Sequence, residues 1–249
     1  MNPRLFTLLA LLPVSWAAAA GCECSAPAPR TAIPVVRAVQ SQGPINLDGR
    51  LDEPDWTRTP TTEAFVSTLD GTPSPPAARA RVLWREEGLL LAFEVEDPLL
   101  LCGFRQHDDT LWEQDVVEVM VDPDGDGRRY VELQVSPSGL VFDTWFDTRR
   151  QPAPFGHRAW SSDLEAGVQT RGEVDDADED EGYTVEMSIP WSAFDPSGGA
   201  ASPPSSGDEW RVALYVLDAR EEGQWGVGWS APLVGDFHVP ERFGRVRFE

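Results

Sequence analysis

The stretch that most directly predicts the fold reads LWEQDVVEVMVD and occupies residues 111–122. A tryptophan and several polar or acidic residues come first, and an alternating segment follows. In that segment Val117, Val119 and Val121 fall on one face of a predicted strand, because successive side chains of a strand point to opposite faces. Glu118 therefore lies on the other face, among apolar neighbours. A carboxylate in that position is usually paired with an arginine or directed into a polar cleft.

Two interpretations of Trp112 and Glu118 follow from this stretch. An indole ring beside a carboxylate on a strand suits a sugar ligand, because the C–H faces of a pyranose pack on the ring and its hydroxyls hydrogen-bond to fixed acceptors. The simpler interpretation is a core or edge tryptophan next to a salt-bridged strand residue. The stretch by itself leaves both open.

Similar short alternating segments, separated by turn residues, continue on both sides of this stretch. They predict strands at 78–85, 89–96, 116–122, 129–136, 140–146, 168–172, 183–189, 211–218 and 245–248. One helical turn is expected around Trp56, and no other part of residues 35–249 shows the helical period over an ordinary helix length. We therefore predict an all-β domain, an antiparallel and jelly-roll-like β-sandwich, over residues 35–249.

The size and charge of the chain limit the functions that can be expected of it. With 249 residues, 41% of them hydrophobic, the chain can bury one sizeable core, so one domain is expected. Its formal charge is −22, and all 20 basic residues are arginines. Such a charge repels nucleic acid and anionic lipid, so we expect neither as a direct partner. Neutral sugars and metal cations are compatible with it.

The N-terminus has the features of an export signal peptide in residues 1–21: Arg4, an apolar stretch and then small residues. The sequence AAGC at 19–22 resembles a bacterial lipoprotein cleavage site, in which Cys22 would carry the lipid. Ordinary signal cleavage is the alternative. An Ala/Pro-rich tether at 22–34 would connect the anchor to the domain. We expect an exported protein of the cell envelope, held at a bacterial membrane only through Cys22, or a secreted protein.

The other two cysteines, Cys24 and Cys102, leave two alternatives open. They form a disulfide in an oxidising compartment, or Cys102 is a buried free thiol and Cys24 a tail residue. Metal binding by cysteine is not expected, because the chain has no CxxC pair.

Residues 122–127, DPDGDG, place Asp122, Asp124 and Asp126 at alternate positions of a glycine-containing turn. Three carboxylates in this arrangement can converge on one calcium ion. The turn is not an EF-hand, because Leu133 stands where that motif has its twelfth-position glutamate and no flanking helices are predicted. A structural calcium site and a plain Asp/Gly turn both remain as interpretations. No other cofactor is expected.

Four motifs occur in the order of a known family. They are INLDGRLDEPDW at 45–56, VLW at 82–84 with LLAFEVEDP at 90–98, WEQDVVE at 112–118, and PERFGRVRF at 240–248. Together they resemble the family 9 carbohydrate-binding modules. The resemblance implies a β-sandwich that binds sugars without catalysis and that serves a glycoside hydrolase, here a separate protein. The implied ligands are plant-type polysaccharides or oligosaccharides, such as xylan, cellulose or glucan ends, bound in support of carbohydrate catabolism.

The resemblance also implies a site in which two aromatic residues sandwich a sugar ring. Trp112 stands at one position of this clamp, and Phe237 stands at the other, where the family has tryptophan. Glu118 matches a polar contact to the ligand. Gln134 occupies the position of a family arginine, and His238 is a further candidate for hydrogen bonds to the sugar.

Departures from the family pattern favour a second hypothesis from another class, a structural or interaction module of the cell envelope that kept the sandwich and lost the sugar site. These departures are Gln134, Phe237, and Val234 in place of an asparagine. Nearby Trp225 and Trp229 offer aromatic surfaces for a different pocket.

Other classes of protein are disfavoured. An enzyme is not expected, because the chain has only three histidines and none of the G-x-S-x-G, H-E-x-x-H or phosphate-loop motifs. A haem-binding sandwich would need axial ligands from those histidines or from Met120 and Met187, and it is the third and weakest hypothesis.

Overall fold

Strands account for almost all of the regular structure in the computed structural model, which describes residues 28–196, 203–220 and 223–249. The strands are β1 (Val35–Gln40), β2 (Val66–Ser67), β3 (Ala77–Trp84), β4 (Gly88–Glu96), β5 (Val116–Asp122), β6 (Tyr130–Val135), β7 (Val141–Phe146), β8 (Glu165–Arg171), β9 (Gly182–Pro190), β10 (Glu209–Arg220), β11 (Gly223–Gly228) and β12 (Gly244–Phe248). The helical elements are α1 (Pro54–Arg58) and the single 3-10 turns η1 (Leu111–Glu113), η2 (Trp191–Phe194) and η3 (Pro240–Arg242). The all-β prediction is confirmed, and α1 is the helical turn expected around Trp56.

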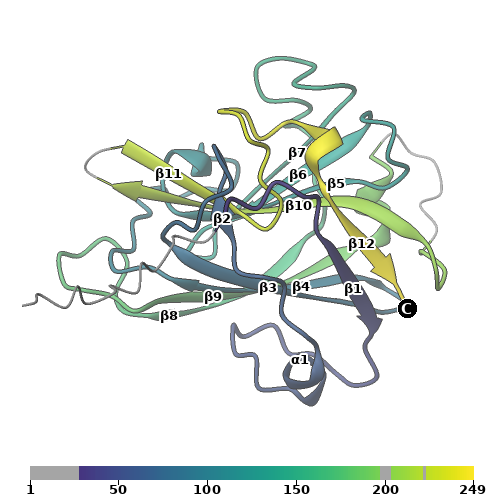
Figure 1. Ribbon diagram of the computed structural model, residues 1–249. Coiled ribbons are helices and arrows are strands. Elements are labelled where there is room, and N and C mark those ends of the chain that lie inside the picture. Colours follow the sequence, from purple (N-terminus) through teal and green to yellow (C-terminus); the bar gives the residue numbers. More distant parts are fainter. Residues whose placement is uncertain (1–27, 197–202, 221–222) are drawn as a thin grey trace, which may run out of the picture.

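The strands form a curled sheet whose two halves face each other as the layers of a β-sandwich (Figure 1). The strand order is β7-β6-β5-β10-β12-β1-β3-β4-β9-β8, and β11 extends from β10 to pair with β2. We call β7, β6, β5, β10 and β12 the first layer, and β3, β4, β9 and β8 the second layer. The predicted hairpin of β3 and β4 and the predicted β5-β6-β7 meander are both present.

Strand β1 belongs to both layers. Its residues 35–38 pair with β12 and its residues 39–40 pair with β3, in parallel in both cases. The sheet is therefore mixed, whereas the sequence predicts only antiparallel pairs. Strands β1, β2 and β11 are not predicted from the sequence. A two-residue strand has no period to detect, and half of the residues of β11 (GQWGVG) are glycines, which are typical of turns.

Apolar residues that point inward from both layers form the main core. The first layer contributes Val117, Val119 and Val121 from β5, and the second contributes residues such as Phe93 and Val185; all are fully buried. The face assignment made from residues 111–122 is thus confirmed. It places Glu118 on the outer face of the first layer.

The outer face of the first layer carries a second apolar cluster. Met120, Tyr130 and Tyr215 belong to it, together with Leu111 from η1 and Phe243 from the segment before β12. Segments that connect strands therefore cover this face, and any hollow that they leave between them opens directly over β5 and β6.

The outer face of the second layer is covered by the segment that carries α1 (Figure 1). Trp56 is fully buried there, and its indole Nε1 donates a 2.7 Å hydrogen bond to Oε1 of Glu186 on β9. Oε2 of the same carboxylate accepts a 2.7 Å hydrogen bond from the N–H of Gly49. Gly49 has a φ of +79°, and a Cβ there would lie 2.2 Å from the backbone nitrogen of Gln169, so this turn requires glycine.

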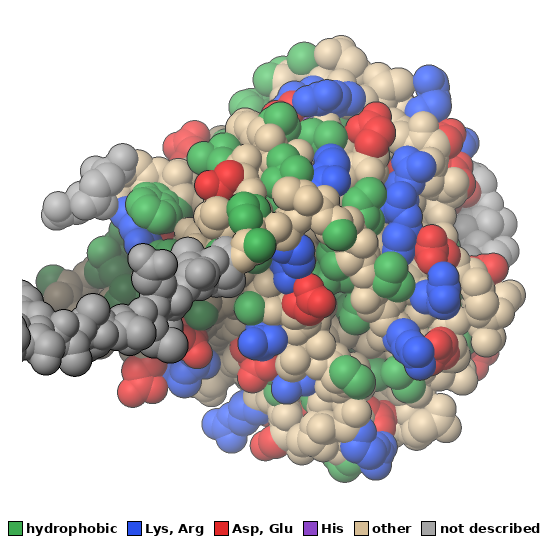
Figure 2. Space-filling model, in the orientation of Figure 1, with side chains coloured by type: hydrophobic (Ala, Val, Ile, Leu, Met, Phe, Trp, Pro, Cys, Tyr) green, Lys and Arg blue, Asp and Glu red, His purple; other side chains and the backbone are tan. Residues whose placement is uncertain are grey.

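Acidic and arginine side chains are interspersed over the face shown in Figure 2. Ion pairs such as that of Arg247 with Glu209 (3.0 Å) join some of them. Among the described residues, no helix combines the length and apolar character needed to cross a membrane. The predicted signal peptide, Cys22 and the first part of the predicted tether lie outside the described residues.

Cys102 is fully buried and is a free thiol. This agrees with the second of the two alternatives for the cysteines. Cys24 lies outside the described residues.

Candidate functional site

A cavity of about 590 Å³ lies on the outer face of the first layer. Glu118 and Met120 of β5 and Glu132 of β6 belong to its floor. Its walls come from residues 67–74, η1, residues 150–155, the β10–β11 hairpin and residues 235–238. Gln224 of the hairpin donates a hydrogen bond to the backbone oxygen of Trp112, which joins two of these wall segments.

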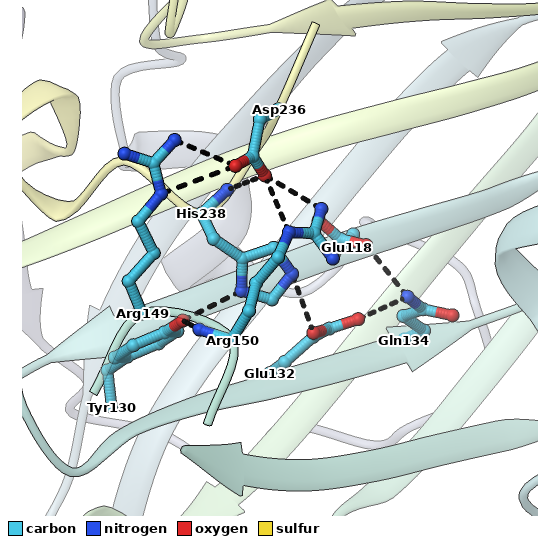
Figure 3. Close-up of polar contacts among 8 residues, drawn as sticks. All are labelled: Glu118, Tyr130, Glu132, Gln134, Arg149, Arg150, Asp236 and His238. Carbon is cyan, nitrogen blue, oxygen red and sulfur yellow. Dashed lines mark hydrogen bonds and ion pairs between the residues drawn. The ribbon is translucent and has the colours of Figure 1, made fainter. Parts of the chain in front are cut away.

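Strand pairing brings three polar side chains together at the floor. Glu118 lies opposite Gln134 in the β5–β6 register, and Glu132 is on the same face two residues earlier in β6. The Gln134 Nε2 donates one hydrogen bond to Glu118 Oε2 and another to Glu132 Oε1, both 2.7 Å long (Figure 3). The three residues are only 2%, 0% and 6% exposed, in the order Glu118, Gln134 and Glu132.

Two oxygen atoms of this group, Oε1 of Glu118 and Oε1 of Gln134, have no hydrogen-bond partner among the described residues. Buried polar atoms in folded proteins are nearly always hydrogen-bonded. The free oxygen of Glu118 belongs to a residue that lines the cavity, so a polar ligand there can supply the missing partner.

A tyrosine and a histidine extend the polar group toward the rim. The hydroxyl of Tyr130 and Nδ1 of His238 are 2.8 Å apart, and Nε2 of His238 lies 3.5 Å from Oε2 of Glu132 (Figure 3). Burial, with a further contribution from the Arg150 charge, lowers the pKa of His238 to about 3. The ring is therefore neutral at neutral pH and adds no charge to the floor.

Two arginines at the rim are held by one carboxylate. Arg149 and Arg150 each approach Asp236 to 2.7 Å, and the N–H of His238 also donates to it (Figure 3). Burial acts to raise the pKa of Asp236, but these hydrogen bonds, chiefly that of Arg150, outweigh it and lower the pKa to about 2. This cluster fixes the segment that carries Phe237 and His238.

Burial also controls the ionisation of the floor. Desolvation, and then the charge of Glu132, raise the pKa of Glu118 well above its ordinary value. Desolvation raises the pKa of Glu132 to about 7, against the opposing effects of Arg150 and Gln134. Burial therefore favours the protonated form of both carboxyl groups of the floor.

Aromatic rings form flat apolar surfaces around this polar floor. The ring of Trp112 contacts Phe142 and Phe155 at centroid distances of 5.0 and 4.9 Å. Phe237 stacks on Tyr215 at 4.6 Å, with 29° between the ring planes. Rings of this kind beside fixed hydrogen-bonding groups suit a ligand with both apolar faces and polar edges.

The structure brings together the residues that the sequence analysis selected for the site. Trp112, Glu118, Phe237 and His238 line the same cavity, and Gln134 contacts Glu118 from the neighbouring strand. Their role in ligand binding stays a prediction.

The two other tryptophan candidates, Trp225 and Trp229, lie in different parts of the structure. Trp225 lines the cavity and is 42% exposed, whereas Trp229 is 1% exposed and packs in the main core. Val234 is 47% exposed on the segment before Phe237.

Three further residues line the cavity that were not predicted from the sequence: Glu132, Arg150 and Phe155. The signal for Glu132 was available, because it precedes Gln134 by two residues and must share its face of β6. Arg150 and Phe155 lie in an irregular segment, where no periodic pattern predicts which way a side chain points.

The carboxylates proposed for calcium converge as the turn motif predicts. Oxygen atoms of Asp122, Asp124 and Asp126 lie within 4.8 Å of one another. Asp122 also accepts a hydrogen bond from the N–H of Gly127, and Arg129 lies 3.1 Å from Asp124. The donor set suits calcium, but the turn also has internal partners that hold it without an ion.

A second group of three carboxylates has no counterpart in the sequence analysis. Asp97, Asp115 and Asp218 are all buried, with oxygen atoms within 4.8 Å of one another. Asp115 accepts hydrogen bonds from the N–H groups of Leu101 (2.6 Å) and Ala219 (2.7 Å). Desolvation is the main reason that the pKa of Asp115 rises to about 8 and that of Asp97 to about 6.

Comparison with known sequences gives one family and two related enzymes. A family model described as carbohydrate family 9 binding domain-like matches residues 47–249. Endo-1,4-beta-xylanase A of Thermotoga neapolitana is 27% identical over 215 residues, and that of Thermotoga maritima is 26% identical over 217 residues. Each match covers 86% of this chain but 18% of the xylanase, so the similarity concerns one part of those proteins.

Solved structures show the same fold. A protein from Bacteroides uniformis superposes with a TM-score of 0.69 at 19% identity, covering 88% of this chain and all of that one. A family 9 carbohydrate binding module from Caldicellulosiruptor kristjanssonii gives TM-scores of 0.58 in its cellotriose complex and 0.57 in its glucose complex. These two matches are 16% and 17% identical and cover 86% of this chain and 93% and 95% of the module.

Proposed function

Because the chain belongs to the carbohydrate family 9 binding domain-like family, whose members are non-catalytic binding modules, we propose that it binds a plant-type polysaccharide or oligosaccharide in the cavity on the outer face of the first layer. The observation that carries the proposal is that Trp112, Phe237 and Glu118 line one cavity although they come from three separate elements. The relatives support it, because the Caldicellulosiruptor kristjanssonii module was solved with cellotriose and with glucose.

In the proposed mode of binding, one face of a sugar ring packs on Trp112 and the other on Phe237. Its hydroxyls then hydrogen-bond to the floor, where Oε1 of Glu118 has no partner among the described residues. Aromatic surfaces of this size stabilise a complex modestly, and few groups are fully desolvated, so we expect dissociation constants of about micromolar to millimolar.

Replacing Trp112 by alanine is expected to weaken sugar binding about 10-fold to 100-fold, because one stacking surface is lost. The measurement is calorimetric titration of the wild type and of Trp112→Ala with glucose, cellobiose, xylobiose and soluble xylan. Val35→Ala is a matched control, since this side chain is exposed on β1 and does not line the cavity. The control should bind like the wild type.

A folded wild-type protein that binds none of these sugars would refute the proposal. The cell-envelope structural or interaction module would then be the better hypothesis. Circular dichroism and thermal melting of each variant establish that the fold is intact.

The location of the protein and its partners belong to the same proposal. We propose that the chain is exported and anchored by lipid at Cys22, and that it supports carbohydrate catabolism by a separate glycoside hydrolase. The occurrence of a similar segment within two xylanases supports this partnership.

A calcium ion at Asp122, Asp124 and Asp126 is the remaining proposal. If it binds there, 5 mM calcium relative to a chelator should raise the melting temperature, because a ligand bound only by the folded state stabilises it. At a calcium concentration of about 100 times the dissociation constant, the gain is about 2.7 kcal/mol. Asp124→Asn should remove the effect, since it takes away one of the three carboxylates, and its exposed ion pair with Arg129 contributes little to stability. An unchanged melting temperature of the wild type would leave the plain Asp/Gly turn as the explanation.

A further inference from the structure

The floor of the cavity contains two carboxyl groups and a single amide that serves both. The Gln134 Nε2 has two hydrogens, and its two 2.7 Å hydrogen bonds to Glu118 and Glu132 use both of them. What remains for a ligand is Oε1 of Glu118, which has no partner among the described residues and belongs to a residue that lines the cavity. When Glu118 is ionised this oxygen only accepts, so a ligand that completes the group then donates a hydrogen bond to it.

The carboxyl groups of the floor also lack a positively charged partner among the described residues. The nearest arginine, Arg150, donates through Nε (2.9 Å) and a terminal nitrogen (2.7 Å) to Asp236. Arg149 is bound to the same carboxylate, and the neutral ring of His238 contributes no charge. Both arginines are therefore engaged at the rim, and neither forms an ion pair with Glu118 or Glu132 among the described residues.

Burying a carboxylate without a cation is costly, and proteins avoid it by pairing the charge or by keeping the proton. Burial and the proximity of Glu132 raise the pKa of Glu118 well above its ordinary value, which favours its protonated form. A cation that enters the cavity removes the reason for that protonation, because both carboxylates then face an opposite charge.

We infer that this cavity selects a sugar that carries a primary ammonium group over the neutral sugar of the same shape. An ammonium offers three hydrogen-bond donors and one positive charge, which match the unpartnered oxygen of Glu118 and the two carboxyl groups of the floor. The indole of Trp112 adds attraction for a cation near its face. This inference rests on the proposed sugar-binding function and narrows it to one class of ligand.

The same chemistry makes a prediction for related sugars. N-acetylation removes the charge and adds bulk, so an N-acetylamino sugar should lose the advantage. A uronic acid should be excluded, because its carboxylate would face Glu118 and Glu132. The ammonium group and not the ring alone therefore determines the order of affinity.

The test is calorimetric titration of the whole protein at pH 6.5 with D-glucosamine, D-glucose, N-acetyl-D-glucosamine and ethanolamine. Glucosamine is expected to bind at least about tenfold more tightly than glucose, and N-acetylglucosamine no better than glucose. Glucosamine binding equal to or weaker than that of glucose overturns this inference but leaves the proposed function intact. Ethanolamine binding as tight as glucosamine also overturns it, because the site would then recognise an amine without a sugar. If none of the sugars binds, the proposed function itself fails.

Two isosteric variants test whether the two carboxyl groups of the floor cause the preference for the ammonium sugar. Glu118→Gln and Glu132→Gln each remove one charge while keeping size and shape, and each should reduce the glucosamine-to-glucose affinity ratio toward 1. Glu113→Gln is the matched control, because Glu113 is exposed beside Trp112 and no carboxyl contact of the floor involves it. It should leave the ratio unchanged. A ratio that survives both floor substitutions overturns the inference, provided that melting curves show folded variants.

The pH dependence gives an independent readout. An ammonium ligand favours ionised carboxylates, and burial raises the pKa of both Glu118 and Glu132, so glucosamine affinity should rise from pH 5 to pH 7 and its binding enthalpy should vary with the ionisation heat of the buffer. Glucose affinity should stay level or fall over the same interval, because the protonated acid is itself a donor to a hydroxyl. A proton release that is the same for both sugars overturns the inference. The titratable and charged groups facing the floor are Glu118 from β5, Tyr130 and Glu132 from β6, Tyr215 from β10, and Arg150, Asp236 and His238 from the rim.

Discussion

Replacing Glu186 by alanine is expected to lower the free energy of unfolding by about 3–5 kcal/mol, which is a large part of the stability of a typical domain. Oε1 of this fully buried carboxylate accepts from the indole of Trp56, and Oε2 accepts from the N–H groups of Gly49 and Asp48 at 2.7 and 3.1 Å. Alanine would leave these donors without an acceptor and would open a cavity beneath the α1 segment.

Chemical denaturation of wild type and Glu186→Ala measures this loss, and the melting temperature should fall by at least about 6 °C. Glu165→Ala is the matched control: Glu165 is exposed on the adjacent strand β8, and its removal should change stability by less than about 0.5 kcal/mol. A Glu186→Ala protein as stable as this control would show that the segment does not depend on the carboxylate for its attachment to the second layer.

The second large effect is a loss of stability as the pH rises from about 4 to about 8. Burial raises the pKa of Asp115 from 3.8 to about 8, that of Asp97 from 3.8 to about 6 and that of Glu132 from 4.5 to about 7. Between the unfolded and folded pKa values the folded chain binds more protons than the unfolded chain. Stability is therefore full below about pH 4 for these groups and declines as the pH rises through the folded values.

One buried group acts in the opposite direction. The pKa of His238 is lowered to about 3, so its neutral form favours the folded state increasingly from about pH 3 to pH 6.5 and has no further effect above that. The net decline should be steepest between about pH 5 and pH 7, where Asp97, Asp115 and Glu132 together outweigh His238, and should slow toward pH 8, where Asp115 is the main one of these groups still ionising. The shift of Asp115 alone corresponds to roughly 6 kcal/mol at full effect, and we expect a measured decline of at least about 2 kcal/mol between pH 5 and pH 8.

Urea denaturation at a series of pH values, with a chelator present, tests this dependence. Asp115→Asn removes the ionisation and should flatten the curve, whatever its effect on absolute stability. Glu165 is exposed on β8 and belongs to none of the buried carboxylate groups, so Glu165→Gln should retain the wild-type slope. A wild-type protein whose stability rises steadily from pH 5 to pH 8 would contradict the prediction.

Much of the fold could be predicted from residues 111–122 and similar segments, because a strand with one buried face has a period that a sequence displays directly. The valines of β5 fall on the inner face as the pattern requires, and Trp56 lies in the expected helical turn. The parallel pairing of β1 with β12 and β3 could not be predicted in the same way. The period of a strand specifies its faces but not its neighbours.

The residues of the candidate site fall into two groups, those on strands and those on irregular segments. Glu118 and Gln134 lie on strands, and the β5–β6 hairpin brings them opposite each other. Arg150, Phe155 and Asp236 lie on irregular segments, whose course depends on hydrogen bonds such as that from Thr144 Oγ1 to the backbone oxygen of Phe155 (2.8 Å). Such contacts form between residues that no local pattern connects, so the residues at the rim of the cavity could not be predicted from the sequence.

The position of β1 between the layers has a consequence for how the chain folds. Val35 pairs with Arg245 and Ala38 with Phe248, so the seam of the sandwich joins residues from opposite ends of the domain. Contacts of such long sequence separation form late and slow the search for the native state. During synthesis, β1 emerges early but has no β12 to pair with until residues 244–248 are made. A nascent or C-terminally truncated chain therefore exposes unpaired strand edges on β1 and β10, and these are the edges at which self-association would begin.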